Sequence, residues 1–220
     1  NGVDNTHPFL QNKVVSEACF STRNRTQKST PTCRNRRKRD ISPGAATVKC
    51  RFQDIACTHG TLLAGIAVGN SLAPNFAGSG VAPEAKLIVV KADSLINSKK
   101  ICKTARTCRV FFDSDLLRGL EFIYRSRFSF NIAAVNASLG GKATRKQCGA
   151  NPIRKTVRKL RAANIAIIAA SGNEGLKTRI SSPACIPGVI SVGATNESDS
   201  VLSFSNNAAS LSLLAPGKDI

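Results

Sequence analysis

The sequence predicts an α/β fold, in which a parallel β-sheet is covered by helices on both faces. Short apolar runs of strand length alternate with longer segments whose apolar residues recur at helical spacing, the pattern of successive βαβ units. Two glycine-rich loops follow two of the apolar runs, where ligand sites gather in parallel sheets. With 220 residues, of which 42% are hydrophobic, the chain can form one large domain with a substantial core.

The first long segment, residues 11–51, is expected to be a loop inserted into this domain. It is polar and basic, contains proline and threonine, and shows little hydrophobic periodicity. One or two disulfides are expected to brace it.

A helix and a buried strand come next. Residues 62–68 form a run of small apolar side chains that predicts a tightly packed helix, in which Gly65 allows a neighbouring element to approach. His59 stands at the expected start of this helix. Residues 86–92 (KLIVVKA) form a short apolar run typical of a strand buried in a parallel sheet.

Two amphipathic helices and three strands follow. Residues 113–127 place leucine and isoleucine side chains at helical spacing behind a suitable N-cap, Asp113 or Ser114. Residues 153–164 predict a second helix, whose outward face carries five basic residues. Three more apolar runs predict strands, at 132–137, 165–170 and 189–194.

The loops that follow two of these strands are the first candidate binding elements. They read SLGG at 138–141 and SGNEG at 171–175. Because the carboxyl ends of parallel strands share one edge of a sheet, we expect both loops at that edge. Glycine there lets a substrate backbone approach closely, although either loop alone could be a turn that simply requires glycine.

The formal net charge of +19 indicates an anionic partner or a solvated basic surface. Nucleic acid, an anionic membrane surface and acidic substrates are all compatible with it. Aromatic residues make up only 5% of the chain, which argues against a surface that stacks nucleic-acid bases. The basic residues concentrate in three segments, at 23–39, 99–109 and 142–161.

The eight cysteines favour disulfides and an oxidising compartment. No CxxC pair occurs and there are only two histidines, so a zinc site is poorly supported, whereas eight reduced thiols remain an alternative. Short separations favour Cys50–Cys57 and Cys102–Cys108. Cys148 with Cys185 would tie two strand–helix units together, which leaves Cys19 with Cys33.

No membrane span is expected, because the chain has no uninterrupted apolar run of about 18 residues. Its start lacks a charged segment followed by an apolar one, so we expect no signal peptide within it.

His59 is the first candidate catalytic residue. A histidine beside a Gly-Thr pair at the start of a packed helix is suited to proton transfer near neutral pH, although a lone histidine is more often a structural residue.

Seven sequence blocks, in order, resemble the subtilisin-like serine peptidases. The resemblance leaves residues 11–51 as the main unmatched part, and implies a Ser-His-Asp hydrolase that cleaves peptide bonds through an acyl-enzyme. The blocks are HGTLLAGIAVGN, GVAPEAKLIVVKA, VNASLGG, IIAASGNEG, SSPACIPGVISVGA, LSFSN and LLAPGKDI.

The resemblance also implies roles for individual residues. His59 is the general base, and the side chain of Asn173 is the oxyanion donor. A strand edge that pairs with the main chain of an extended substrate is formed by Ser138, Leu139 and Gly140. The pocket for the substrate side chain lies between that edge and Ala170, Ser171 and Gly172.

Two departures from the family pattern concern the other triad residues. Gly2 and Val3 match the last two positions of the D-[ST]-G-[VI] motif, so the aspartate would stand just before Asn1. Asp4 falls after the glycine and is rejected as a substitute. No G-T-S run for the nucleophile occurs, and the LSFSN serines match structural positions. We therefore expect a partial peptidase domain, 1–220, truncated at both ends and inactive alone, from a secreted or periplasmic endopeptidase.

Several further expectations complete this interpretation. Substrates are proteins or peptides, and the chain is expected to be a monomer. Glu174 could favour basic substrate side chains if it pointed inward. The loop at 69–80 matches a calcium loop of the family but contains Asn70 and Asn75 and no acid, so no metal or other cofactor is expected. The multibasic run at 34–39 is a candidate processing site. The rival function is a non-catalytic module that binds polyanions through its basic surface.

Overall fold

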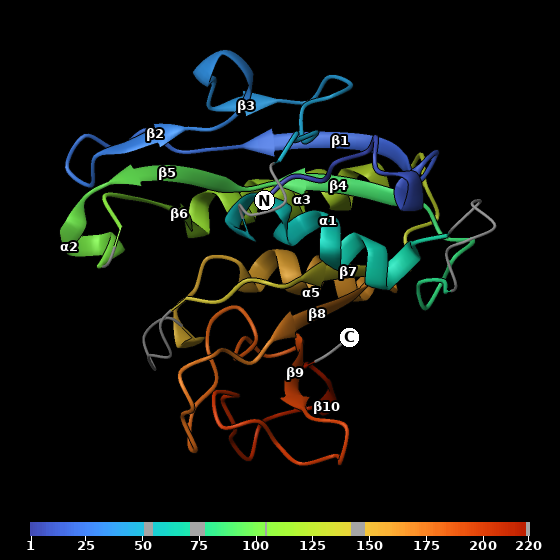
Figure 1. The fold of residues 1–220 in the computed structure, drawn as a ribbon, viewed down its shortest axis with the longest axis vertical. Coiled ribbons are helices and arrows are strands. Elements are labelled where there is room, and N and C mark those ends of the chain that lie inside the picture. Colours follow the sequence, from blue (N-terminus) through green and yellow to red (C-terminus); the bar gives the residue numbers. More distant parts are fainter. Residues whose placement is uncertain (51–54, 71–77, 104, 142–147, 219–220) are drawn as a thin grey trace. The chain divides into compact units, whose positions relative to one another are not determined.

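The computed structural model describes residues 1–50, 55–70, 78–103, 105–141 and 148–218. The chain forms two compact units, Asn1–Ile123 and Tyr124–Ile220, and each is described by itself. Figure 1 shows the elements of both units, which combine sheets with helices as the α/β prediction requires.

The first sheet of unit 1 has the strand order β3-β1-β4. Strand β1 (Val14–Phe20) lies between β3 (Arg39–Asp40), which is antiparallel to it, and β4 (Leu87–Lys91), which is parallel to it. The predicted strand at 86–92 is therefore confirmed as β4. The prediction that all of 11–51 is a loop is wrong, because β1 is the central strand of this sheet.

Glu17 explains why β1 lacks a clear apolar pattern. Its carboxylate accepts hydrogen bonds from the backbone N–H groups of Gly44 and Ala46 and from the hydroxyl of Thr47. A charged side chain inside the strand is thus satisfied by the chain that follows it, and this pairing cannot be inferred from local periodicity.

A second sheet of unit 1 is fully antiparallel and has the order β2-β5-β6. It consists of β2 (Ser29–Pro31), β5 (Asp93–Asn97) and β6 (Thr107–Phe111). None of these strands was predicted. Strand β2 belongs to the segment expected to be a loop, whose described residues carry three strands.

Two helices of unit 1 contribute to its apolar core. Helix α1 (Ile55–Val68) buries Ala64 and Val68 beside Leu10 of the short 3-10 helix η1 (Pro8–Leu10). Helix α3 (Asp113–Ser126) runs across the boundary between the units and confirms the helix predicted at 113–127. The remaining helices are short: η2 (Arg34–Arg36) and α2 (Lys99–Cys102).

Unit 2 contains a parallel four-stranded sheet with the order β10-β9-β8-β7. Its strands are β7 (Ala134–Ala137), β8 (Ala166–Ala170), β9 (Ile190–Thr195) and β10 (Leu213–Pro216), and α5 (Arg154–Ala162) packs against β8. The three predicted strands and the second amphipathic helix are confirmed, whereas β10 was not anticipated.

The four disulfides are those predicted: Cys19–Cys33, Cys50–Cys57, Cys102–Cys108 and Cys148–Cys185. These bonds use all eight cysteines, so the alternative of eight reduced thiols is not what the structure shows. Within the described ranges, no helix combines the length and the apolarity that crossing a bilayer requires.

Candidate active site

His59 lies one turn inside α1, because the helix begins at Ile55 rather than at the histidine. The imidazole is half-buried. Two residues earlier, Cys57 forms its disulfide with Cys50, so this end of the helix is covalently tied to the preceding segment.

The residues after His59 hold α1 against the N-terminal segment. A Cβ atom on Gly60 would stand 2.2 Å from the carbonyl oxygen of Gly2, so only glycine permits this approach. The hydroxyl of Thr61 accepts a 2.9 Å hydrogen bond from the backbone N–H of Asp4. The HGT sequence therefore places His59 beside the segment that resembles the end of a D-[ST]-G-[VI] motif.

Burial lowers the pKa of His59 below its ordinary value of 6.5, and the positive charge of the Asn1 amine lowers it further. Burial, the larger of the two causes, favours the neutral imidazole, which is the form that accepts a proton. The electrostatics of this position therefore suit a general base.

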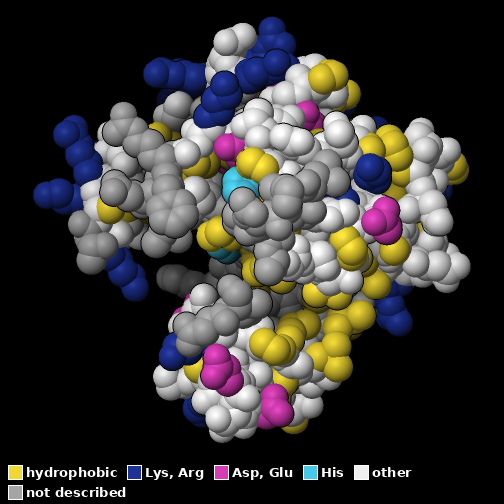
Figure 2. Space-filling model, turned by 45° about the vertical axis from the view of Figure 1, so that its right-hand side comes forward, with side chains coloured by type: hydrophobic (Ala, Val, Ile, Leu, Met, Phe, Trp, Pro, Cys, Tyr) yellow, Lys and Arg dark blue, Asp and Glu magenta, His cyan; other side chains and the backbone are white. Residues whose placement is uncertain are grey.

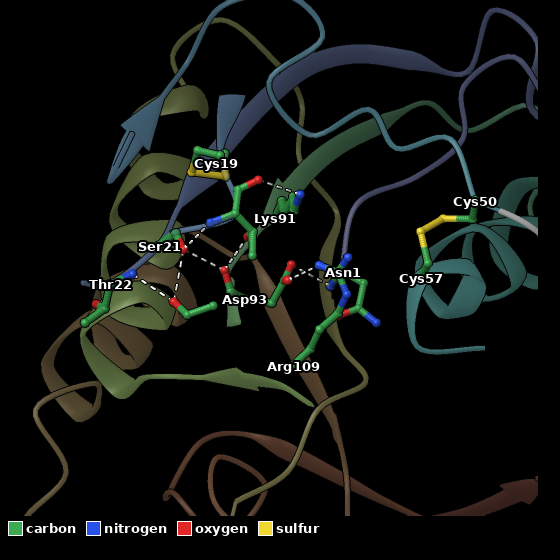
Figure 3. A network of polar contacts seen from close by, with 12 residues as sticks. Asn1, Cys19, Ser21, Thr22, Cys50, Cys57, Lys91, Asp93 and Arg109 are labelled. Carbon is green, nitrogen blue, oxygen red and sulfur yellow. Dashed lines mark hydrogen bonds and ion pairs between the residues drawn. A yellow bond between two sulfur atoms is a disulfide. The ribbon is translucent and has the colours of Figure 1, made fainter. Parts of the chain in front are cut away.

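A polar network that the sequence did not predict lies beside Asn1 (Figure 3). The buried carboxylate of Asp93 forms a 2.6 Å ion pair with Arg109, and its other oxygen is 3.9 Å from the Asn1 nitrogen. Burial lowers the pKa of the neighbouring Lys91 ammonium, whose nitrogen donates to the carbonyl of Thr32. One signal in the sequence could have pointed to Asp93: it directly follows the predicted parallel strand at 86–92.

Asp4, rejected above as a catalytic aspartate, uses one carboxylate oxygen locally. That oxygen accepts hydrogen bonds from the backbone N–H and the hydroxyl of Thr6, at 3.0 and 2.6 Å. The Asp4 side chain thus stabilises a local turn of the backbone just after Gly2 and Val3.

In unit 2, the two glycine-rich loops follow β7 and β8 and share a neighbour, the Ser181–Ser182 segment. Gly141 donates its backbone N–H to the carbonyl of Ser182 at 2.8 Å, and Ser181 donates its own to the carbonyl of Ser171 at 2.7 Å. The structure thus brings together the predicted substrate-binding residues: Ser138, Leu139 and Gly140 after β7, and Ala170 at the end of β8 with Ser171 and Gly172 after it.

Asn173 is exposed at the tip of the second loop. The residue before it, Gly172, has a φ of +112°, a backbone conformation that residues other than glycine rarely adopt. Glu174, after it, does not act as a free charge: one carboxylate oxygen accepts from the buried Asn206 at 2.6 Å and from Ser181 at 3.2 Å. Sequence reasoning missed Asn206, although it ends the LSFSN block.

His59 belongs to unit 1, whereas Asn173 and the predicted substrate-binding residues belong to unit 2. Within the described ranges, no group of three acidic, histidine or cysteine side chains could hold a metal ion. Most of the loop compared with a calcium site, residues 71–77, lies outside the described residues.

Comparisons with known proteins agree with these features. A profile of the subtilase family matches residues 1–219. Subtilisin E of Bacillus subtilis (strain 168) is 33% identical over 174 residues, 77% of this chain and 39% of subtilisin E. Subtilisin-like protease 3 of Pseudogymnoascus destructans is 33% identical over 165 residues, 74% of this chain and 35% of that protein. The chain therefore spans about two fifths of these relatives.

Among solved structures, the self-cleaved protease domain of PatA matches with a TM-score of 0.60 at 25% identity, over 99% of this chain and 64% of that one. The fold is of the α/β class, with glycine-rich loops after the parallel strands β7 and β8. The chain belongs to the subtilase family.

Proposed function

We propose that this chain is the central part of a serine endopeptidase that hydrolyses protein or peptide substrates. The observation that carries the proposal is the state of His59, which is half-buried, favoured in its neutral form and braced against Gly2 by Gly60. Membership of the subtilase family and the names of the subtilisin relatives support it.

In this proposal His59 takes the proton of a serine hydroxyl as the serine attacks the substrate carbonyl, and then returns the proton to the leaving amine. The Asn173 side chain donates a hydrogen bond to the oxygen on which negative charge develops. The edge at 138–140 pairs with the substrate main chain, and the substrate side chain enters between that edge and 170–172.

The serine and aspartate of the triad are expected outside these 220 residues, because no G-T-S run occurs in them and Asp4 follows the motif glycine. The 220 residues alone are therefore expected to leave peptides intact. The four disulfides support secretion of the mature protein into an oxidising compartment.

The test is to assay the mature protein that contains these residues on a denatured protein substrate, with His59→Ala as the variant. We expect cleavage by the wild type, labelling by a serine-directed phosphonate, and loss of both in H59A. A variant at the exposed Leu62, on the same helix, is the matched control. Cleavage by H59A at the wild-type rate would exclude the role of His59 as base.

The alternative, a subtilase-fold module that binds polyanions, rests on the exposed run at 34–39. Arg34 is paired with Asp40, but no salt bridge among the described residues includes the next four cations: Arg36, Arg37, Lys38 and Arg39. Figure 2 shows Lys and Arg side chains gathered at the top of the view, the level at which Figure 1 places β3.

Chromatography on heparin tests this alternative. Retention well above about 0.15 M salt, where the Debye length is near 8 Å, would support it, together with loss of retention when the four cations are replaced by glutamine. Elution below that salt concentration would count against it.

A further inference from the structure

The loop that carries Asn173 is attached on both sides of that residue to Asn206. The backbone N–H of Asn206 donates to the carbonyl oxygen of Gly172 at 2.9 Å. The side-chain oxygen of Asn206 accepts from the backbone N–H of Glu174 at 3.1 Å. One residue, more than thirty positions away in the sequence, thus holds both neighbours of Asn173.

The side chain of Asn206 is fully buried, and both ends of its amide are used. The oxygen also accepts from the N–H of Leu176 at 2.9 Å. The nitrogen donates to the Glu174 carboxylate at 2.6 Å and to the carbonyl of Ser171 at 3.2 Å, with the Ser181 hydroxyl at the same distance. Because a buried amide that loses its partners is costly, these contacts fix the loop in one arrangement.

Gly172 shows how tightly the loop is packed on this cluster. A Cβ atom there would stand 2.2 Å from the Asn206 nitrogen, 2.3 Å from the Ser181 hydroxyl and 2.7 Å from the Glu174 carboxylate. The Glu174 carboxylate therefore lies close to Gly172, the residue before Asn173.

Asn173 differs from its neighbours. Its side chain is exposed, and it takes part in none of the side-chain hydrogen bonds found among the described residues. Its placement is set by the backbone on either side rather than by contacts of its amide, which leaves the amide available to a ligand.

We propose that Asn206 is a positioning residue for Asn173, with the Glu174 carboxylate as its charged partner. This inference rests on the proposed peptidase function and adds to it: Glu174 anchors the loop instead of selecting basic substrate side chains. Pre-organised donors are effective because they do not reorganise as charge develops.

The first test measures kcat and KM of the mature protein on two peptide p-nitroanilides, with phenylalanine or lysine before the scissile bond. Asn206→Ala is expected to lower kcat about 10–100-fold on both substrates, the range expected for a donor displaced by about 1 Å, and to leave KM within about twofold. Asn207→Ala is the matched control, because the Asn207 backbone N–H, which donates to Leu176, is retained by alanine.

The second test exchanges donor and acceptor between the two partners. Asn206→Asp alone would place two carboxylates in contact, so a loss of kcat is expected. Glu174→Gln in the N206D background supplies an amide donor to the new carboxylate, and kcat is expected to recover at least about tenfold relative to N206D. Rescue by a second substitution separates a specific pairing from general damage to the fold.

A third measurement, on the mature protein, has a readout other than activity. Amide hydrogen exchange at Glu174 and Leu176 is expected to accelerate in N206A and to stay unchanged in N207A, with the exchange of β8 unaffected in both.

The outcomes separate the two proposals. A wild-type protein that cleaves neither peptide overturns the peptidase function, and with it any role of Asn206 in catalysis. Cleavage by the wild type together with an unchanged kcat in N206A overturns the positioning role alone. The single variant Glu174→Gln is measured on the same two substrates. A loss of kcat/KM confined to the lysine substrate would also overturn the positioning role, because it would make Glu174 a specificity residue.

Discussion

Gly60 in α1 lies so close to Gly2 that a Cβ atom on Gly60 would stand 2.2 Å from the Gly2 carbonyl oxygen. The obstacle is backbone rather than a flexible side chain, so the contact cannot be relieved by a change of rotamer. The spacing of the helix from the N-terminal segment, and with it the position of His59, is fixed by the absence of a side chain at residue 60.

Gly60→Ala is therefore expected to destabilise the chain although alanine favours helices. Overpacking against backbone typically costs about 1–3 kcal/mol, more than the ~1 kcal/mol that alanine gains over glycine within a helix. Urea unfolding checks this prediction. Gly149→Ala is the control, since a Cβ atom at Gly149 meets nothing within 4 Å. Equal midpoints for G60A and the wild type would contradict it.

His59 is expected to titrate below 6.5, because burial and the neighbouring amine both oppose its protonation. The folded state then binds fewer protons than the unfolded state as the pH falls through 6.5, so this group lowers stability progressively below that pH. In an NMR titration, the His59 ring resonances should move at a lower pH than those of a histidine in an unfolded peptide.

A corresponding change is expected in the stability of the 220 residues. His59→Asn should lessen the loss of stability between neutral and mildly acid pH. An equal loss in H59N and the wild type would contradict this prediction.

The disulfides are expected to contribute unequally. Cys148–Cys185 closes a loop with a sequence separation of 37, whereas Cys102–Cys108 closes one of 6. The chain-entropy model then assigns about 4 kcal/mol to the first and about 2 kcal/mol to the second. Paired Cys→Ser variants, compared by denaturant unfolding under otherwise identical conditions, measure both values. A larger loss for the shorter loop would show that strain or residual structure outweighs loop entropy.

Limited trypsin digestion is expected to cut first within the run at 34–39, which is exposed and rich in arginine. A cut after Arg37 leaves β1 on one fragment and β4 on the other, so the fragments should stay together in native gel filtration. No disulfide crosses the cut, so they should separate in denaturing electrophoresis even without reductant.

The control for this digestion replaces the cations after Arg34 by glutamine. That variant should lose the early cut. First cuts at α5 or in the basic segment at 99–109 would contradict the prediction.

The sequence predicted most of the parallel strands but not β1 or β10, because buried strands and amphipathic helices leave a local signal. Strands β4, β7, β8 and β9 and helices α3 and α5 follow that rule. Strand β1 does not, since Glu17 inside it is satisfied by Gly44, Ala46 and Thr47. In β5, Asp93 and Ser94 are buried polar residues whose partners, Arg109 and Ser21, lie far away in the sequence.

The candidate site divides in the same way. His59 and Asn173 were found because each stands in a short motif beside glycine. Asn206 and Ser181 were missed because their contribution depends on hydrogen bonds between segments that are distant in the sequence. The hydrogen bonds that hold a functional loop in place are formed by tertiary structure. A sequence motif marks the functional residue and not the residues that hold it.

Strand order has a consequence for how the chain is made. In unit 2 each strand pairs with the one synthesised just before it, from β7 to β10, so this sheet can grow as the polypeptide leaves the ribosome. In unit 1, Val14 pairs with Leu87, so β1 must wait for much of the unit to emerge before it gains its parallel neighbour. Until then that edge of β1 is open to pairing with strands of other chains.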